Sequence, residues 1–439
     1  MLEGLKNHIG VFKSSSWRVK LSALVMGSGQ IFYGCIAKGI IFLLLEIGFI
    51  SYMVSRGCED IEGFFTLGTQ KADAWLGIAG DNSVVMLLMG IFAWIIVALF
   101  IGIYITNIKD VINIENTIIS GKRPKGFIDE LKGLVDRKFY VTVLVLPVIG
   151  VCIFNILPII FMILISFTNY GGSVVPPELV DWVGVDNFKK ILTLSKFAPT
   201  FIRILGWNIL WAVVSTTLNY FAGIGLALLL NKDCVKGKAF FRAFPILAYA
   251  IPGFITLLAF KFMFSYGGPI NHMIKGAGGV PIGFLDLDAK WIARLIGLLV
   301  NCWISVPSIM LLATGHLSNR DMSLYEAAKI DGATPFEQFK KLTLPFMLFA
   351  TMPVLLGQFI GNFNNFGIFY FLRGGLYLDG YFLASDTDLL INWLYNLSID
   401  NNYYCIGAAI SLIIFIITSV ISLLVYVNSP SFKEEDTFQ

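Results

Sequence analysis

Charged residues are scarce in this sequence. Asp, Glu, Lys and Arg together make up 14% of its 439 residues, whereas soluble proteins contain about a quarter. Hydrophobic residues make up 56%, and the mean hydropathy is +0.77. So few charges would cover the surface of a soluble core of this size poorly, and disordered or collagen-like chains are excluded as well. We therefore expect a polytopic membrane protein.

Residue types that build catalytic or metal centres are few and dispersed. The three histidines, His8, His272 and His316, lie far apart in the sequence, and the six cysteines form no CxxC pair. No group of His, Asp and Glu converges as a membrane-embedded enzyme would require. We expect no catalytic residue, no metal and no cofactor. The net charge of +3 is too small to indicate binding to nucleic acid.

A phosphate-binding loop is also missing. The GK dipeptides at Gly121 and Gly237 lack the upstream Gly and the following Ser or Thr of a Walker A motif. We therefore expect a non-catalytic chain, and any ATP hydrolysis must come from a separate subunit.

Long apolar runs are abundant, and about 20 mostly apolar residues are enough to cross a bilayer. Eight stretches qualify: 36–55, 84–106, 140–168, 204–230, 240–264, 291–314, 346–370 and 405–428. The apolar piece at 21–35 is too short to span alone, and it could be re-entrant or interfacial. We expect an all-α integral membrane protein with about eight transmembrane helices.

The distribution of Lys and Arg predicts the orientation. If the N-terminus is inside, the inner segments hold more than twice as many Lys and Arg as the outer loops. Both termini are therefore expected to be cytoplasmic. We predict an N-terminal region, 1–139, with two extra transmembrane helices and a cytoplasmic linker, followed by a six-helix transmembrane core, 140–439.

The cytoplasmic loop 315–345 has two sets of helix-start residues. Ser323 to Glu326 and Thr334 to Glu337 each have the spacing of a capping box. Gly332 lies between them and can adopt the left-handed conformation that ends a helix. The loop is thus predicted to form a helix-turn-helix on the cytoplasmic face. It could rest on lipid headgroups, or it could dock a soluble partner.

The same loop resembles the EAA loop of permeases from ATP-binding-cassette (ABC) importers. It has Glu326-Ala-Ala, then Gly332 six residues after Glu326, then Leu342-Thr-Leu-Pro345. In that family the loop inserts into a cleft of a cytoplasmic ATPase subunit. The resemblance therefore implies that five residues couple this chain to an ATPase: Glu326, Ala327, Ala328, Asp331 and Gly332.

The resemblance covers nearly the whole chain and is closest to the longer permease of the maltose/maltodextrin type. It rests on matching segments at 166–169, 183–188, 244–252, 301–303, 362–366 and 387–393. It implies a multi-pass protein of a prokaryotic cytoplasmic membrane. The implied partners are a second permease, a cytoplasmic ABC ATPase dimer and an extracytoplasmic sugar-binding protein. Some relatives have a large outer domain in the third loop, and this chain lacks it.

Polar residues within the apolar stretches indicate where a solute could bind. Carboxamides and hydroxyls both donate and accept hydrogen bonds, as sugar hydroxyls do, although such groups can also join packed helices. Alignment with maltose-type motifs selects seven residues as sugar contacts: Tyr249, Asn301, Ile304, Ser305, Gln358, Asn362 and Asn365.

The favoured function is the permease subunit of an importer that moves an oligosaccharide, most simply maltose or a maltodextrin. Other solutes remain open, namely galacto-oligosaccharides, raffinose-type sugars and glycerol phosphate. A secondary transporter would need buried ionisable residues and inverted repeats, and neither is clear in this sequence.

Overall fold

The computed structural model describes residues 15–73, 75–124, 126, 132–133, 135–136, 139–232, 234–318, 321–428 and 432. Their regular structure is helical, with only isolated β-bridges besides. The chain forms two compact units, Met1–Val183 and Gly184–Gln439. The predicted division at residue 139 stays a prediction, as does the side of the membrane on which the loops lie. Most of both termini lies outside the described residues.

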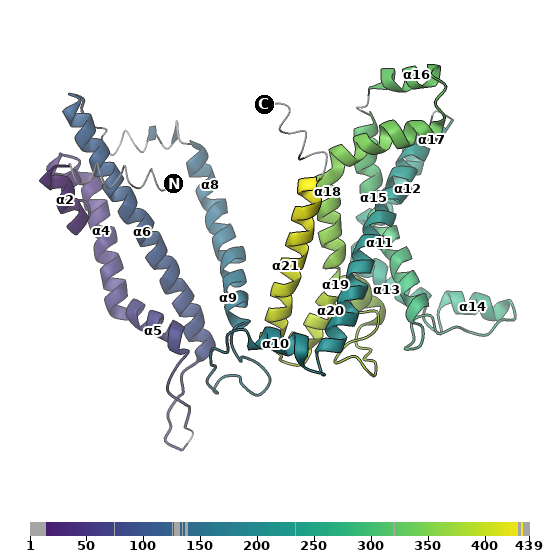
Figure 1. Ribbon diagram of the computed structural model, residues 1–439, viewed down its shortest axis with the longest axis horizontal. Coiled ribbons are helices and arrows are strands. Elements are labelled where there is room, and N and C mark those ends of the chain that lie inside the picture. Colours follow the sequence, from purple (N-terminus) through teal and green to yellow (C-terminus); the bar gives the residue numbers. More distant parts are fainter. Residues whose placement is uncertain are drawn as a thin grey trace. The chain divides into compact units, whose positions relative to one another are not determined.

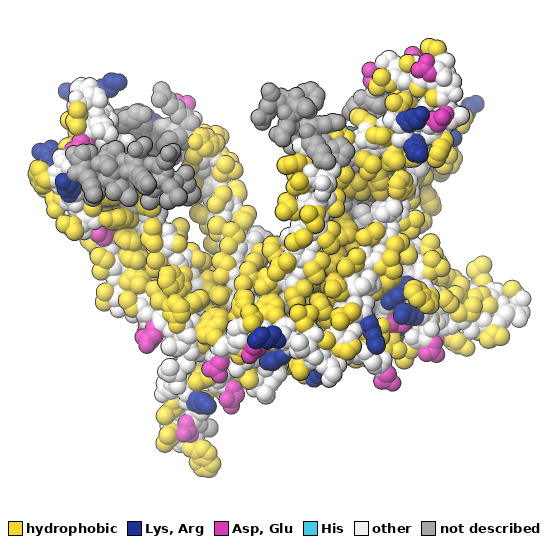
Figure 2. All heavy atoms as spheres, viewed as in Figure 1, with side chains coloured by type: hydrophobic (Ala, Val, Ile, Leu, Met, Phe, Trp, Pro, Cys, Tyr) yellow, Lys and Arg dark blue, Asp and Glu magenta, His cyan; other side chains and the backbone are white. Residues whose placement is uncertain are grey.

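The helices confirm an all-α membrane protein with about eight spans. Within the described residues seven helices are long and apolar enough to cross a bilayer: Ile36–Thr66, Ser83–Ile119, Phe139–Ile165, Ala198–Asn231, Lys290–Ser318, Pro335–Arg373 and Tyr404–Asn428. An eighth span is a bent pair of shorter helices. In both units hydrophobic side chains cover the long helices, and charged ones gather near the helix ends (Figure 2).

Unit 1 is built on the long helix α6. Its helices are α2 (Trp17–Leu24), α3 (Ser28–Phe32), α4 (Ile36–Tyr52), η1 (Met53–Gly57), α5 (Cys58–Thr66), α6 (Ser83–Ile119), α8 (Phe139–Val151), η2 (Cys152–Ile156) and α9 (Leu157–Ile165). The segment 21–35 lies in α2 and α3, which are too short to span. The buried Asn107 of α6 holds this segment, since its Oδ1 accepts hydrogen bonds from Gln30 (2.9 Å) and from the Gly27 backbone (3.2 Å).

Unit 2 contains the remaining helices (Figure 1). They are α10 (Asp186–Thr193), α11 (Ala198–Asn231), α12 (Lys238–Ala250), α13 (Gly253–Met263), α14 (Pro269–Gly276), α15 (Lys290–Ser318), α16 (Met322–Ile330), α17 (Pro335–Gln338), η3 (Phe339–Thr343), α18 (Leu344–Phe363), α19 (Phe366–Arg373), α20 (Leu390–Tyr395), η4 (Asn396–Asp400) and α21 (Tyr404–Asn428).

The core of unit 2 is the contact between α11 and α15. A glycine permits their close approach, because a Cβ added to Gly223 would lie 2.5 Å from the Ile309 side chain. Farther along the same contact Gly297 faces Trp211 and Phe369, which are fully buried. The helices α18, α19 and α20 pack against this pair, and α21 packs against α18 and α20.

The stretch predicted as one span at 240–264 is not a continuous helix. It consists of α12 and α13, which meet at an angle of 93°. Pro252 lacks the amide hydrogen that would continue α12, and its ring disfavours helical dihedrals at Ile251. Ile251 is accordingly extended, with φ −79° and ψ 132°. The hydropathy of the stretch is unchanged by this break, so composition alone did not reveal it.

Candidate functional site

A helix break places polar side chains within an otherwise apolar segment. α18 ends at Phe363 and α19 begins at Phe366, so Asn364 and Asn365 lie between two helices. Asn365 caps α19, since its Oδ1 accepts a hydrogen bond of 3.3 Å from the Ile368 backbone. A carboxamide at this position accepts a hydrogen bond from a backbone amide of the first turn, which has no partner within the helix.

Three of the predicted sugar contacts form a chain of carboxamides around this break. Asn365 Nδ2 donates to Asn301 Oδ1, and Asn301 Nδ2 donates to Asn362 Oδ1, both over 3.2 Å. Asn362 Nδ2 in turn donates to the Thr216 hydroxyl of α11 over 3.0 Å. Asn301 and Asn362 are buried, so much of their hydrogen-bonding capacity serves to join α11, α15, α18 and α19.

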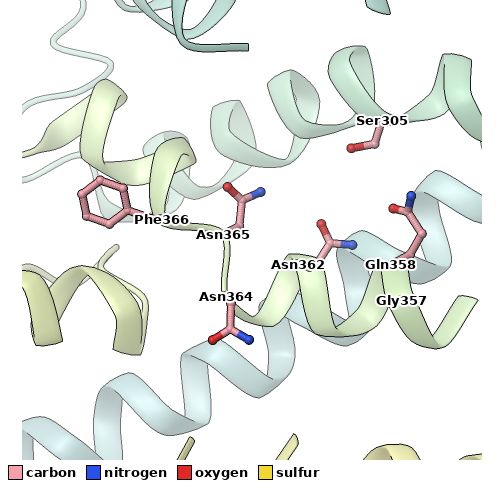
Figure 3. A pocket seen from close by; sticks show the side chains of 8 residues that line it. Ser305, Gly357, Gln358, Asn362, Asn364, Asn365 and Phe366 are labelled. Carbon is pink, nitrogen blue, oxygen red and sulfur yellow. The ribbon is translucent and has the colours of Figure 1, made fainter. Parts of the chain in front are cut away.

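A pocket of about 380 Å³ opens beside this chain. It is lined by Ser305, Gly357, Gln358, Gly361, Asn362, Asn364, Asn365 and Phe366. Figure 3 shows Gln358, Asn362 and Asn365 pointing toward the helix of Ser305, whereas Asn364 points away from it. None of the eight lining residues is ionisable. Such a surface offers hydrogen-bond donors and acceptors together with an aromatic ring, but no charge.

Four of the seven predicted sugar contacts therefore line one pocket, namely Ser305, Gln358, Asn362 and Asn365. Asn301 lies behind them and bonds to two of their amides. Ile304 is half-buried against the apolar core, and Tyr249 on α12 is exposed; neither lines the pocket. Sequence analysis missed Thr216, because no motif marks a lone threonine in an apolar helix.

The loop 315–345 forms the predicted helix-turn-helix, with α16 followed by α17 and η3. The second capping box is present. The Glu337 backbone donates to Thr334 Oγ1 (3.3 Å), and Glu337 Oε2 accepts from the Thr334 backbone (2.8 Å). Gly332 has φ +78° and ends the first helix. Its left-handed conformation turns the chain from α16 into α17.

The first predicted capping box is wrong. α16 begins at Met322 with Asp321 as its N-cap, and Asp321 Oδ1 accepts a hydrogen bond of 2.9 Å from the Ser323 backbone. Hydrogen bonds from Ser323 hold the pKa of the Asp321 carboxyl below its usual value. A carboxylate two residues upstream is thus the cap in place of the Ser323 hydroxyl.

The predicted coupling residues lie on the outer surface of this helix pair. Glu326, Ala327, Asp331 and Gly332 are exposed and Ala328 is half-buried. The neighbouring apolar side chains Leu324 and Phe336 are 57% and 71% exposed. The inward-facing residue is Tyr325, which is buried and bonds to the Thr343 hydroxyl. We did not identify Tyr325 from the sequence, because it lies beside the EAA motif and not within it.

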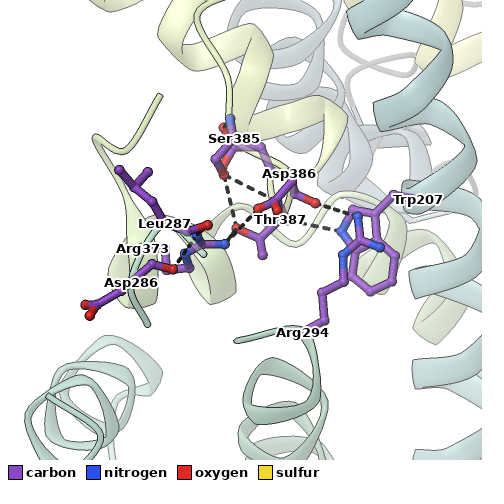
Figure 4. Close-up of polar contacts among 9 residues, drawn as sticks. Trp207, Asp286, Leu287, Arg294, Arg373, Ser385, Asp386 and Thr387 are labelled. Atoms are coloured by element: carbon purple, nitrogen blue, oxygen red, sulfur yellow. Dashed lines mark hydrogen bonds and ion pairs between the residues drawn. The ribbon is translucent and has the colours of Figure 1, made fainter. Parts of the chain in front are cut away.

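At the end of unit 2 away from α16 and α17, a buried ion pair organises the loop that follows α19. Arg373 Nη1 donates to Asp386 Oδ1 over 2.8 Å, and Nη2 donates to the carbonyls of Asp286 and Leu287 (Figure 4). The nearby Asp388 is buried, and burial raises the pKa of its carboxyl to about 6. One arginine therefore fastens two loops that are far apart in the sequence.

Comparison with known proteins gives one consistent picture. Residues 220–434 match the family model described as "Binding-protein-dependent transport system inner membrane component". The maltodextrin transport system permease protein MalC of Streptococcus pneumoniae is 34% identical over 98% of this chain and 99% of its own length. The galactooligosaccharides transport system permease protein GanP of Bacillus subtilis is also 34% identical, over 94% of this chain and 98% of its own.

Solved structures show the same fold. One is a bacterial ABC transporter involved in the import of the acidic polysaccharide alginate. One of its chains aligns with a TM-score of 0.55 at 23% identity, covering 68% of this chain and 97% of that chain. At this identity the likeness concerns the fold alone.

Proposed function

The chain belongs to the family of binding-protein-dependent transport system inner membrane components, as a sugar permease subunit of an ABC importer in the cytoplasmic membrane, and from this premise we propose that its solute is a neutral oligosaccharide, most simply a maltodextrin. The observation behind this proposal is the uncharged pocket lined by Ser305, Gln358, Asn362 and Asn365. A pocket for an ion or an amino acid would be expected to contain a compensating charge.

The chemistry of the pocket suits a sugar. Each carboxamide supplies both a donor and an acceptor, so it can bind a hydroxyl in either sense. The ring of Phe366 can cover the apolar face of a pyranose. The amides of Asn362 and Asn365 are already held by Asn301 and Thr216. This arrangement supports a preorganised site, which reduces the entropy lost on binding.

We propose that α16 and α17 dock on a cytoplasmic ATPase dimer that hydrolyses ATP for the transporter, so this chain itself is not an enzyme. The exposure of Glu326, Ala327, Asp331 and Gly332 supports this assignment, as do the exposed apolar side chains beside them. A second permease and an extracytoplasmic sugar-binding protein would complete the assembly. ATP binding would then favour one of two global states and hydrolysis the other.

A galacto-oligosaccharide is the second candidate solute. It is favoured by the similarity to GanP, which equals the similarity to MalC in percentage identity. The pocket itself does not distinguish glucose-containing from galactose-containing oligomers, since hydroxyls of either orientation can bond to carboxamides.

Co-purification followed by reconstitution tests the proposal. The tagged chain is isolated from its native membranes in detergent, and the accompanying subunits are identified by mass. We expect a P-loop ATPase and a second permease. The complex is then placed in liposomes with its binding protein and offered labelled maltotriose or a galactotriose. ATP-dependent uptake of maltotriose supports the proposal, and uptake of galactotriose alone supports the second candidate. A chain that purifies alone and moves solute without ATP would contradict both.

A further inference from the structure

Unit 2 has another pocket at the ends of α11 and α15 that lie away from α16 and α17. Its volume is about 570 Å³, and it is lined by Ile202, Arg203, Gly206, Trp207, Leu210, Lys290, Arg294 and Tyr381. These residues come from the first half of α11, the first turns of α15 and the loop that follows α19. We call it the basic pocket. It shares no residue with the pocket lined by Ser305, Gln358, Asn362 and Asn365, which we call the solute pocket because we propose that the sugar binds there.

The basic pocket holds positive charge without a matching acid. Its lining includes Arg203, Lys290 and Arg294 and no carboxylate. Arg203 donates to the Gly380 carbonyl over 3.1 Å. Within the part of the chain that the structure describes, none of the three cations forms an ion pair. The Asp386 carboxylate acts on Arg294 electrostatically, but it is already paired with Arg373.

Arg294 is the most constrained of the three cations. Its side chain is buried, with the residue only 8% exposed, and its guanidinium lies 3.7 Å from the centre of the Trp207 ring. It donates from Nη2 to the Asp386 carbonyl (Figure 4), whereas its buried Nε has no hydrogen-bond partner. Burying a positive charge without an ion-pair partner is costly, and an anion bound beside the guanidinium would offset that cost.

The surface next to these cations is apolar. Ile202, Gly206 and Leu210 are four residues apart and therefore lie along one face of α11. Ile202 is 63% exposed and Leu210 is 50% exposed, and Val213 continues the exposed face by one turn. All of them belong to a helix long and apolar enough to span a bilayer.

Aromatic residues lie beside the cations of the basic pocket. Trp207 and Tyr381 line the basic pocket, and the centre of the Trp291 ring lies 5.0 Å from the Arg294 guanidinium. Trp and Tyr are enriched where a spanning helix meets the lipid headgroups. A water-soluble anion would use the cations alone, whereas an amphiphilic anion would also use the apolar face of α11.

We propose that the basic pocket binds the phosphodiester headgroup of an anionic phospholipid, with an acyl chain along the Ile202, Gly206 and Leu210 face of α11. Arg203 and Lys290 attract the phosphate, and the guanidinium of Arg294, which also lines the pocket, adds a third positive charge. Basic pockets between transmembrane helices on the cytoplasmic side bind anionic headgroups, and this pocket offers the same chemistry at the opposite end of α11 and α15. The site does not depend on which sugar the transporter moves.

Native mass spectrometry of the purified full-length transporter tests this site. Phosphatidylglycerol or phosphatidylcholine of equal chain length is titrated into the detergent-solubilised complex. The double variant Arg203→Gln, Lys290→Gln removes two cations that are not buried. The control Lys275→Gln removes one exposed cation from α14, outside the basic pocket. We expect the double variant to need about thirtyfold more phosphatidylglycerol for equal occupancy, with the control and the binding of phosphatidylcholine unchanged.

Several results would overturn the proposal. Equal binding of phosphatidylglycerol to the wild type and the double variant would do so, as would equal binding of the two lipids by the wild type. Displacement of the lipid by 10 mM inorganic phosphate alone would indicate a site for soluble anions. Loss of a partner subunit from the double variant would indicate a protein interface. If the double variant does not fold, Lys290→Gln alone is expected to weaken binding about fivefold.

Discussion

Tyr325 of α16 and Thr343 at the end of η3 share a hydrogen bond of 3.1 Å between their hydroxyl oxygens, and both residues are buried. Thr343 directly precedes α18, and α18 extends to Gln358 and Asn362 in the solute pocket. A movement of α16 can therefore reach the pocket through one continuous stretch of helix. Packed rigid elements of this kind transmit a change between two discrete arrangements.

Replacing Tyr325 with Phe tests this connection. The substitution keeps the buried ring but leaves the Thr343 hydroxyl without this partner, a loss of about 1 kcal/mol. We expect reconstituted transporters to hydrolyse ATP while importing less sugar per ATP. The matched variant Thr343→Val is expected to behave alike, and the double variant no worse than either single variant. An unchanged ratio of sugar to ATP in both single variants would exclude this connection.

We expect Gly332 to be required because its backbone conformation favours glycine, and not because a larger side chain would clash there. It has φ +78°, and no atom lies within 4 Å of the position that a Cβ would occupy. Gly332→Ala would thus cost about 1 kcal/mol of backbone strain and weaken ATPase retention several-fold, whereas Gly332→Asn would cost less. The amount of ATPase that co-purifies with each variant measures this difference. Equal retention in wild type and Gly332→Ala would contradict the expectation.

Local sequence patterns predicted much of this fold. Hydropathy located the spans because a membrane helix must be apolar over its whole length. The Thr334 to Glu337 box and Gly332 were predicted correctly because a cap depends on residues within one turn. The box at Ser323 was wrong because a competing carboxylate, Asp321, lies two residues away and caps the helix first.

Long-range pairs could not be predicted in this way. Arg373 and Asp386 are separated by a loop, and Arg294 meets Asp386 across 92 residues. Neither pair leaves a periodic pattern in the sequence. The candidate solute site could be predicted only in part. The Asn cluster at 362–365 is visible in the sequence because it is local. Its contacts with Asn301 and Thr216 arise only when α11, α15 and α18 pack.

Asp388 is expected to make the loop between α19 and α20 less stable as pH rises. Burial raises its pKa from 3.8 to about 6, so between these values the folded state binds a proton that the unfolded state has lost. The contribution of Asp388 to stability is therefore fully present below pH 3.8 and is lost as pH rises through 6. Thermal unfolding of wild type and Asp388→Asn at pH 5 and pH 7.5 tests this. The wild type should lose about 1 kcal/mol more than the variant over this range. Parallel losses would show that Asp388 does not titrate there.

Gln358 provides the cleanest test of the solute pocket. It lines the pocket, and no hydrogen bond links it to another residue that the structure describes. Gln358→Met should therefore remove a sugar contact without loosening the helices. Asn365→Ala would also remove the cap of α19 and the bond to Asn301. We expect Gln358→Met to raise the KM for oligosaccharide uptake about threefold to tenfold, the loss of one neutral hydrogen bond. Maximal uptake should change little, whereas Asn365→Ala should lower it and the melting temperature.

The control for this test is Gln70→Met, the same chemical change at an exposed position of unit 1. It is expected to leave KM and the melting temperature at their wild-type values. If Gln358→Met also leaves KM unchanged, the pocket beside the α18–α19 break is not where the sugar binds. The carboxamide chain of Asn301, Asn362 and Asn365 would then serve only to join the helices, as polar side chains within membranes often do.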